Sequence, residues 1–142
     1  MKVIQGKHKG TILKGFDING TRPTMDRVKE SLFAMIQNDI YNKSCLDLFA
    51  GSGNLGIEAL SMQARQVVFV DHNQTAITTI KENLSKVHEQ AKVINLDYQK
   101  ALNYFYQNNI TFDIIFLDPP YQTDYIKQSI ELIDKYNLLN KN

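Results

Sequence analysis

From residue 43 onward, short apolar segments alternate with segments in which apolar residues recur at helical spacing. Such an alternation predicts parallel strands joined by right-handed helical crossovers, with helices on both faces of one sheet. In sheets of this kind, ligands bind beyond the carboxyl ends of the strands. The sequence therefore predicts an α/β fold and indicates which edge of its sheet carries the functional site. The predicted strands are residues 46–49, 66–70, 92–96 and 112–117.

The fourth predicted strand is followed directly by Asp118-Pro119-Pro120-Tyr121. The two prolines stiffen the backbone and leave its carbonyls available as acceptors. This set suits a planar ring with an exocyclic amino group, because Asp118 and the Pro119 carbonyl can accept its two N–H donors while Tyr121 stacks on the ring. Accepting both protons would localise the lone pair on nitrogen and make it nucleophilic. Taken alone, the tetrapeptide is equally compatible with a turn that closes a strand, with Asp118 as a cap.

The first predicted strand leads into a glycine-rich turn, Gly51-Ser52-Gly53-Asn54-Leu55-Gly56, which fits the pattern G-x-G-x-x-G. Asp71 ends the second strand, where a carboxylate holds ribose hydroxyls in nicotinamide and S-adenosylmethionine sites alike. Asp47 favours S-adenosylmethionine, because that cofactor carries a sulfonium and an ammonium, whereas a carboxylate repels a pyrophosphate. Alternatively, Asp47 fixes the glycine turn by a hydrogen bond. Asp97, after the third strand, is either an acceptor for an adenine amino group or a helix N-cap.

Residues 1–20 form a basic N-terminal arm, in which no acidic residue precedes Asp17. Regularly placed glycines interrupt short β-like pieces, which predicts a small hairpin outside the core. Its spaced lysines can hold nucleic-acid phosphates; the alternative is a solvated lysine-rich terminus. The whole chain carries 16 basic and 15 acidic residues, so its net charge of +1 requires neither a nucleic acid nor a membrane as partner. The lysines of the arm are Lys2, Lys7, Lys9 and Lys14.

A helix is predicted after the arm, with Thr24 as its N-cap. Arg22 and Arg27 flank this cap, where each can bind a phosphate or a cofactor carboxylate, or remain a surface charge. Apolar residues at helical spacing predict one buried face of the helix. That face consists of Val28, Leu32, Met35, Ile36 and Ile40.

The single cysteine, Cys45, lies beside an apolar strand, where a buried thiol is the ordinary case, and one cysteine cannot form an intrachain disulfide. No apolar run approaches the roughly 20 residues of a membrane span. The N-terminus shows no sustained apolar segment of the kind that a signal peptide requires. We therefore expect a cytoplasmic protein that contacts no membrane.

With these residues in view, the chain resembles the RsmD family of bacterial rRNA methyltransferases. The resemblance implies a Rossmann-like S-adenosylmethionine-dependent methyltransferase domain over residues 21–142. It also implies transfer of a methyl group from S-adenosylmethionine to the exocyclic N2 of a guanine in 16S rRNA. The motifs that carry it span nearly the whole chain: residues 3–10, Arg22-Pro23-Thr24 with residues 26–30, residues 47–61, Phe69-Val70-Asp71, and Asp118-Pro119-Pro120-Tyr121.

The resemblance also implies roles for single residues. The catalytic group is Asp118-Pro119-Pro120-Tyr121, and the partner is 16S rRNA or an assembling small ribosomal subunit, bound by a monomer without a metal. The family sheet has seven strands, whereas four are predicted here, so we expect a C-terminally truncated chain that lacks the later strands. The implied cofactor residues are Asp47, Ala50, Gly51, Gly53, Asp71, His72 and Asp97, and the implied RNA contacts are Lys7, Lys9, Arg22 and Arg27.

Two classes of alternative stay open from the residues alone. An Asp-Pro-Pro-Tyr turn serves any planar amine, so the substrate could be adenine N6 or cytosine N4 in DNA, or a protein glutamine. The chain could instead be an RNA-binding or ribosome-assembly protein that keeps the scaffold without catalysis. A nicotinamide oxidoreductase is a more distant third.

Overall fold

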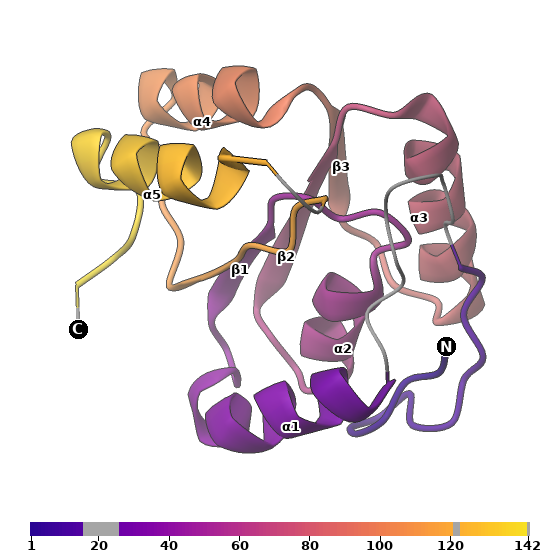
Figure 1. Ribbon diagram of the computed structural model, residues 1–142. Coiled ribbons are helices and arrows are strands. Elements are labelled where there is room, and N and C mark those ends of the chain that lie inside the picture. The colour runs from indigo at the N-terminus through magenta and orange to yellow at the C-terminus, as the bar shows by residue number, and fades with distance from the viewer. Residues whose placement is uncertain (16–25, 121–122, 142) are drawn as a thin grey trace.

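The structure is a computed structural model that describes residues 1–15, 26–120 and 123–141. Within these residues, a sheet of four parallel strands is ordered β3-β2-β1-β4 (Figure 1). The prediction of a parallel α/β sheet is confirmed. Arg22, Thr24 and Tyr121 lie outside the described residues. The strands are β1 (Ser44–Asp47), β2 (Gln66–Asp71), β3 (Lys92–Asn95) and β4 (Ile114–Phe116).

The strand order reverses direction next to β1. The chain passes from β1 outward through β2 to β3, and β4 then pairs with the other side of β1. The register places Asp47 opposite both Phe69 and Phe116, and Asp71 opposite Asn95. The carboxyl ends of the strands therefore meet at one edge, and the gap between β1 and β4 is the topological switch point where such sheets bind ligands.

Helices cover both faces of this sheet, as the sequence predicts (Figure 1). Successive strand residues point to opposite faces, so that Cys45 packs with α1, α2 and α3 in one core, while Leu46 packs with α4 and α5 in the other. Burial raises the pKa of the Cys45 thiol to about 12, with smaller contributions from nearby carboxylates, as expected for an inert buried cysteine. The helices are α1 (Asp26–Ile36), the 3-10 turn η1 (Gln37–Asp39), α2 (Asn54–Ser61), α3 (Gln74–Lys86), α4 (Tyr98–Gln107) and α5 (Tyr125–Lys135).

The predicted buried face of α1 is partly wrong. Val28 and Met35 are 52% and 82% exposed, whereas Lys29 and Phe33 are fully buried. Leu32 and Ile36 pack only partly against the core, and Ile40 is buried as predicted. The helix is rotated about its axis relative to the predicted face, because Lys29 pairs with a buried carboxylate, Glu58. The pattern of apolar residues does not reveal this pair.

The N-terminal arm forms a hairpin, but it is part of the core. Lys2 and Ile12 form an antiparallel bridge, and Val3 N donates to Thr11 O at 2.9 Å. The expectation of a hairpin outside the core is wrong, because Val3 and Leu13 are 1% and 3% exposed and join the cluster around α2 and α3.

The chain after α5 returns to the sheet. Phe112 and Leu139 form a parallel bridge, and Asn140 N donates to Phe112 O at 2.7 Å. This segment lies where a further strand would pair with β4, so α5 behaves as a crossover helix. None of the helices in the described ranges is long and apolar enough to cross a membrane.

Candidate cofactor and catalytic site

The glycine turn connects β1 to α2 through two left-handed residues. Gly51 and Gly53 have φ angles of 58° and 83°, a region that favours glycine. At Gly56, inside α2, an added Cβ would approach the Phe69 ring to 2.3 Å, so only glycine allows α2 to pack this closely on β2. Ala50 N donates to Val70 O at 2.9 Å and anchors the start of the turn on β2. The third glycine of the motif thus serves packing, and the first two shape the turn.

Asp71 joins the end of β2 to the glycine turn. Its Oδ2 accepts from Gly51 N and its Oδ1 from Asn73 N, both at 2.9 Å. The Asp71 side chain is 13% exposed, and a carboxylate with two backbone donors still has lone pairs for a ligand hydroxyl. His72 is largely exposed, with Nδ1 3.9 Å from Asp71 Oδ1. Of Asp71 and His72, both predicted to bind the cofactor, Asp71 is therefore more firmly fixed by its hydrogen bonds.

Asp47 is a buried carboxylate under the glycine turn. Its Oδ2 accepts from Gly56 N at 3.0 Å, which is the turn-fixing contact named above as the alternative role. Burial raises the pKa of Asp47 to about 7; the Gly56 hydrogen bond opposes the shift, and the charges of Asp118 and Asp71 add to it. The hydrogen bond shows that Asp47 fixes the turn, while its burial beside two further carboxylates disfavours its charged form.

The Asp118-Pro119-Pro120 segment lies across the switch point from the glycine turn. Leu48 N donates to Phe116 O at 3.2 Å, and Asp118 lies two residues after Phe116, the last residue of β4. Asp118 is exposed, and its charge acts on Asp47. The half-buried Pro120 accepts from the Thr123 hydroxyl at 3.1 Å through its carbonyl. The structure thus places the predicted catalytic aspartate at the same edge of the sheet as the predicted cofactor turn.

Asp97 caps α4. Its Oδ1 accepts from Lys100 N at 3.0 Å, with extended backbone angles typical of an N-cap. The N-cap alternative is therefore confirmed, and a contact to an adenine amino group stays a prediction. Asn73 caps α3 in the same way, because Asn73 Oδ1 accepts from Thr75 N at 2.8 Å.

The predicted RNA-binding cations are not equivalent. Lys7 Nζ lies 3.0 Å from Glu89, which also binds His8 Nε2 at 2.7 Å. Lys9 and Arg27 are exposed and pair with no acidic side chain in the ranges that the structure describes. Of the exposed cations, Lys9 and Arg27 are thus freer than Lys7 to meet a phosphate.

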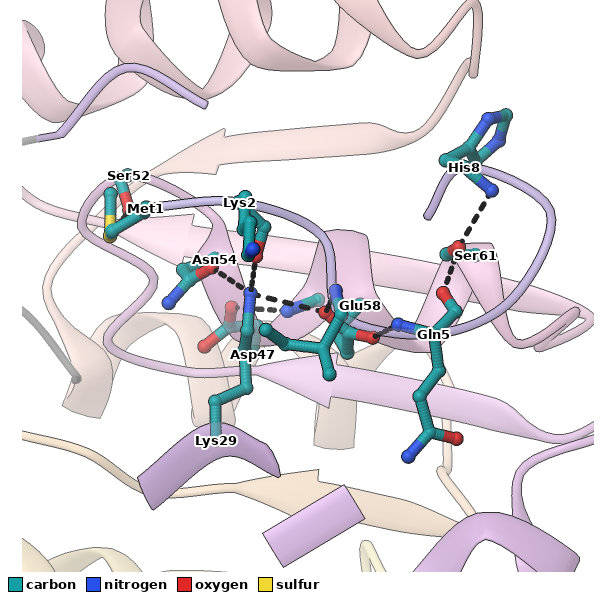
Figure 2. A network of polar contacts seen from close by, with 12 residues as sticks. Met1, Lys2, Gln5, His8, Lys29, Asp47, Ser52, Asn54, Glu58 and Ser61 are labelled. Carbon is teal, nitrogen blue, oxygen red and sulfur yellow. Dashed lines mark hydrogen bonds and ion pairs between the residues drawn. The ribbon is translucent and has the colours of Figure 1, made fainter. Parts of the chain in front are cut away.

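A buried polar network under the arm was missed by the sequence reasoning (Figure 2). Lys29 Nζ lies 3.1 Å from Glu58 Oε1, and both side chains are 0% exposed. Glu58 also accepts from Ile4 N and Gln5 N, at 3.0 and 2.8 Å. The available signal was Glu58 itself, the one charged residue in Asn54–Ser61, a helix whose residues are all buried.

Carboxylates from neighbouring strands gather at the carboxyl edge of the sheet. Asp71 and Asp118 both act on Asp47, and neither Asp47 nor Asp71 pairs with a lysine or arginine among residues 1–15, 26–120 and 123–141. A ligand with positive charge would relieve this repulsion, whereas a pyrophosphate would add to it. The donors and acceptors of this edge therefore fit a cationic ligand with ribose hydroxyls better than a dinucleotide.

Comparison with known proteins gives matches over nearly the whole chain. A family model described as Conserved hypothetical protein 95 matches residues 1–142. Ribosomal RNA small subunit methyltransferase D of Haemophilus influenzae is 42% identical over 147 residues, covering 100% of this chain and 75% of that protein. The yhhF protein of Escherichia coli has a TM-score of 0.85 at 29% identity, covering 99% of this chain and 75% of that one. The chain spans about three quarters of the length of both proteins.

A more distant likeness concerns the fold alone. A SAM-dependent methyltransferase from Agrobacterium tumefaciens has a TM-score of 0.69 at 21% identity, covering 85% of this chain and 42% of that chain. The parallel sheet described above is thus the Rossmann-like sheet of S-adenosylmethionine-dependent methyltransferases, as the sequence predicts.

Proposed function

Because this chain belongs to the RsmD family, we propose that it is an rRNA methyltransferase that uses S-adenosylmethionine to methylate the exocyclic N2 of a guanine in small-subunit rRNA. The observation that carries the proposal is the pairing of β1 with β4, because the glycine turn follows one strand and the Asp118-Pro119-Pro120 segment follows the other, with Asp118 close enough for its charge to act on Asp47. The Asp118 segment offers hydrogen-bond acceptors for an amine, and the glycine turn offers a binding site for a cationic cofactor.

On the cofactor side, S-adenosylmethionine supplies a methyl group on a sulfonium, which is already a strong methyl donor. Asp71 has lone pairs left for ribose hydroxyls, and Gly51 to Gly53 let the backbone approach the ligand closely. Asp47 contributes negative charge beneath the turn, which favours a cation at this edge. His72 and Asp97 flank the adenosine side in the proposed arrangement.

On the substrate side, Asp118 and the Pro119 carbonyl accept hydrogen bonds from the two N–H groups of the guanine amine, and Tyr121 stacks on the base. The base must leave its helix, because an amine in a stacked duplex is out of reach. Alignment of the amine with the methyl group makes the largest contribution to catalysis, since correct orientation can contribute about 7–11 kcal/mol. Asp118 takes up the proton as the nitrogen becomes acidic, an effect of about 10²–10⁴-fold.

On the RNA side, the arm and the start of α1 supply the cations. Lys9 and Arg27 contact phosphates in our proposal, joined by Arg22 and by Lys7 if it leaves Glu89. The substrate is 16S rRNA or an assembling small subunit, and the enzyme acts as a cytoplasmic monomer without a metal.

The test is transfer of tritium from S-adenosylmethionine to small ribosomal subunits that lack the modification, followed by digestion and nucleoside identification. We expect label in N2-methylguanosine. Label in N6-methyladenosine or N4-methylcytidine of the rRNA, or in protein, would contradict a guanine amine as the substrate. Absence of S-adenosylmethionine binding in calorimetry would favour an RNA-binding protein without catalysis.

A further inference from the structure

Two buried polar side chains tie the N-terminal arm to the glycine turn. Lys29 lies on α1 and Asn83 on α3, and both are 0% exposed. Neither residue is needed to hold the methyl donor or the amine in the mechanism proposed above. Their contacts nevertheless end on the backbone of the arm at one side and on the glycine turn at the other.

Lys29 makes the first connection. Its Nζ donates to Lys2 O in the arm at 2.7 Å and to Asn54 Oδ1 at 2.6 Å, and it pairs with Glu58 (Figure 2). Asn54 is the first residue of α2 and directly follows Gly53. All three N–H donors of the Lys29 ammonium are therefore engaged by partners in the arm, the turn and α2.

Asn83 makes the second connection. Its Nδ2 donates to Lys14 O in the arm and to Ser52 O in the glycine turn, both at 2.9 Å. Its Oδ1 accepts from Lys14 N at 2.8 Å. One amide side chain thus fixes both backbone groups of Lys14 and a carbonyl of the turn.

We propose that Lys29 and Asn83 are positioning residues that make the arm and the glycine turn one mechanical unit, so that RNA held by the arm and cofactor held by the turn bind cooperatively. This inference rests on the proposed function. Buried charges and amides are costly unless they are paired, and the partners of Lys29 and Asn83 lie in the arm, in the glycine turn and, for Glu58, in α2. Because such coupling is reciprocal, bound RNA raises the affinity for S-adenosylmethionine by the same factor as the cofactor raises the affinity for RNA.

The experiment compares the wild-type chain with Asn83→Leu and with the double variant Lys29→Met/Glu58→Met. The double variant removes both buried charges together, so neither is left unpaired. Glu82→Gln is the matched control, because it removes only the exposed ion pair to Lys14 at 3.2 Å and keeps the backbone contacts of Lys14 to Asn83.

The first readout is the dissociation constant of S-adenosylmethionine with and without small ribosomal subunits. We expect subunits to tighten cofactor binding by about tenfold in wild type and in Glu82→Gln. In the two uncoupled variants, Asn83→Leu and Lys29→Met/Glu58→Met, we expect a factor of less than about two. A merely stabilising role would lower the melting temperature of those variants and leave the tenfold factor unchanged, which would overturn the proposal.

The second readout is amide exchange of Gly53, whose N–H donates to Ala50 O at 2.8 Å inside the turn. We expect faster exchange in the two uncoupled variants and wild-type exchange in Glu82→Gln. Unchanged exchange in all three variants would contradict the mechanical link. This readout needs no RNA and no methyl transfer, so the inference and the proposed function can fail separately.

Discussion

Asp71 Oδ2 accepts a hydrogen bond from Gly51 N at 2.9 Å, so the carboxyl end of β2 and the turn after β1 form one unit. We expect Asp71→Asn to weaken S-adenosylmethionine binding by at least about tenfold, because the amide loses the charge and one acceptor oxygen of a carboxylate with two backbone donors. Calorimetry measures this change. Equal affinity in the variant and in wild type would remove Asp71 from the cofactor site.

Asp47 predicts how cofactor affinity depends on pH. Because its pKa is raised to about 7, the carboxylate ionises around neutral pH, and its charge then favours a cationic ligand. We expect S-adenosylmethionine affinity to rise between pH 6 and 8 in wild type and to stay flat in Asp47→Asn. A slope of equal size in both proteins would place the titrating group elsewhere.

The same residue predicts a change in stability with pH. The folded-state pKa of Asp47 is raised from 3.8 to about 7, so the folded state binds more protons than the unfolded state between these values. Its contribution to the free energy of unfolding is fully present below about pH 4 and is lost as the pH rises through 7, by on the order of 4 kcal/mol. Urea denaturation across this range, with Asp47→Asn as the reference, checks the sign. A wild-type chain that gains stability relative to the variant as the pH rises would contradict it.

The buried pair of Lys29 and Glu58 predicts strongly non-additive mutations. Lys29→Met leaves Glu58 buried and unpaired, which should lower the free energy of unfolding by about 3–5 kcal/mol. Replacing both residues by methionine should cost much less than the sum of the single changes. Denaturation of the two single variants and the double variant gives the coupling energy, and simple additivity would show that the pair does not act as a unit.

Lys7 and Lys9 predict different salt dependences of RNA binding. Lys9 is exposed without an ion pair in the described part of the chain, whereas Lys7 already pairs with Glu89. We expect Lys9→Ala to reduce the slope of log K against log salt by about 0.7–0.9, the value for one phosphate contact. Lys7→Ala should change the slope less. Binding titrations at several salt concentrations test this ranking, and a reversed order would mean that Lys7 exchanges Glu89 for a phosphate.

The layered sheet was predictable from the sequence because strand and helix periods alternate and the chemical motifs fall at strand ends. Asp71 and Asp118 could be placed at one edge in this way, since the carboxyl ends of parallel strands meet there. The buried face of α1 and the position of the arm in the core could not be predicted from the sequence. Both depend on the buried contact of Lys29 with Glu58, and a pattern based on hydrophobicity assigns two charged residues to the surface.

Asp97 shows another limit of sequence reasoning. A carboxylate at the start of a helix satisfies the pattern of an N-cap and that of a cofactor contact equally well. The hydrogen bond from Lys100 N confirms the cap, and the residue's second oxygen still allows a ligand contact.

The central claim is that Asp118 grips the amine opposite a methyl donor held by the glycine turn, and the variant Asp118→Ala tests it most directly. Tritium transfer to small ribosomal subunits is measured beside calorimetric binding of S-adenosylmethionine, with Asp124→Ala, an aspartate at the start of α5, as the control. We expect transfer by Asp118→Ala to fall by at least about 10²-fold while cofactor affinity stays within about twofold of wild type. Retained transfer, or loss of transfer and cofactor binding together, would contradict the assignment of Asp118 to the amine.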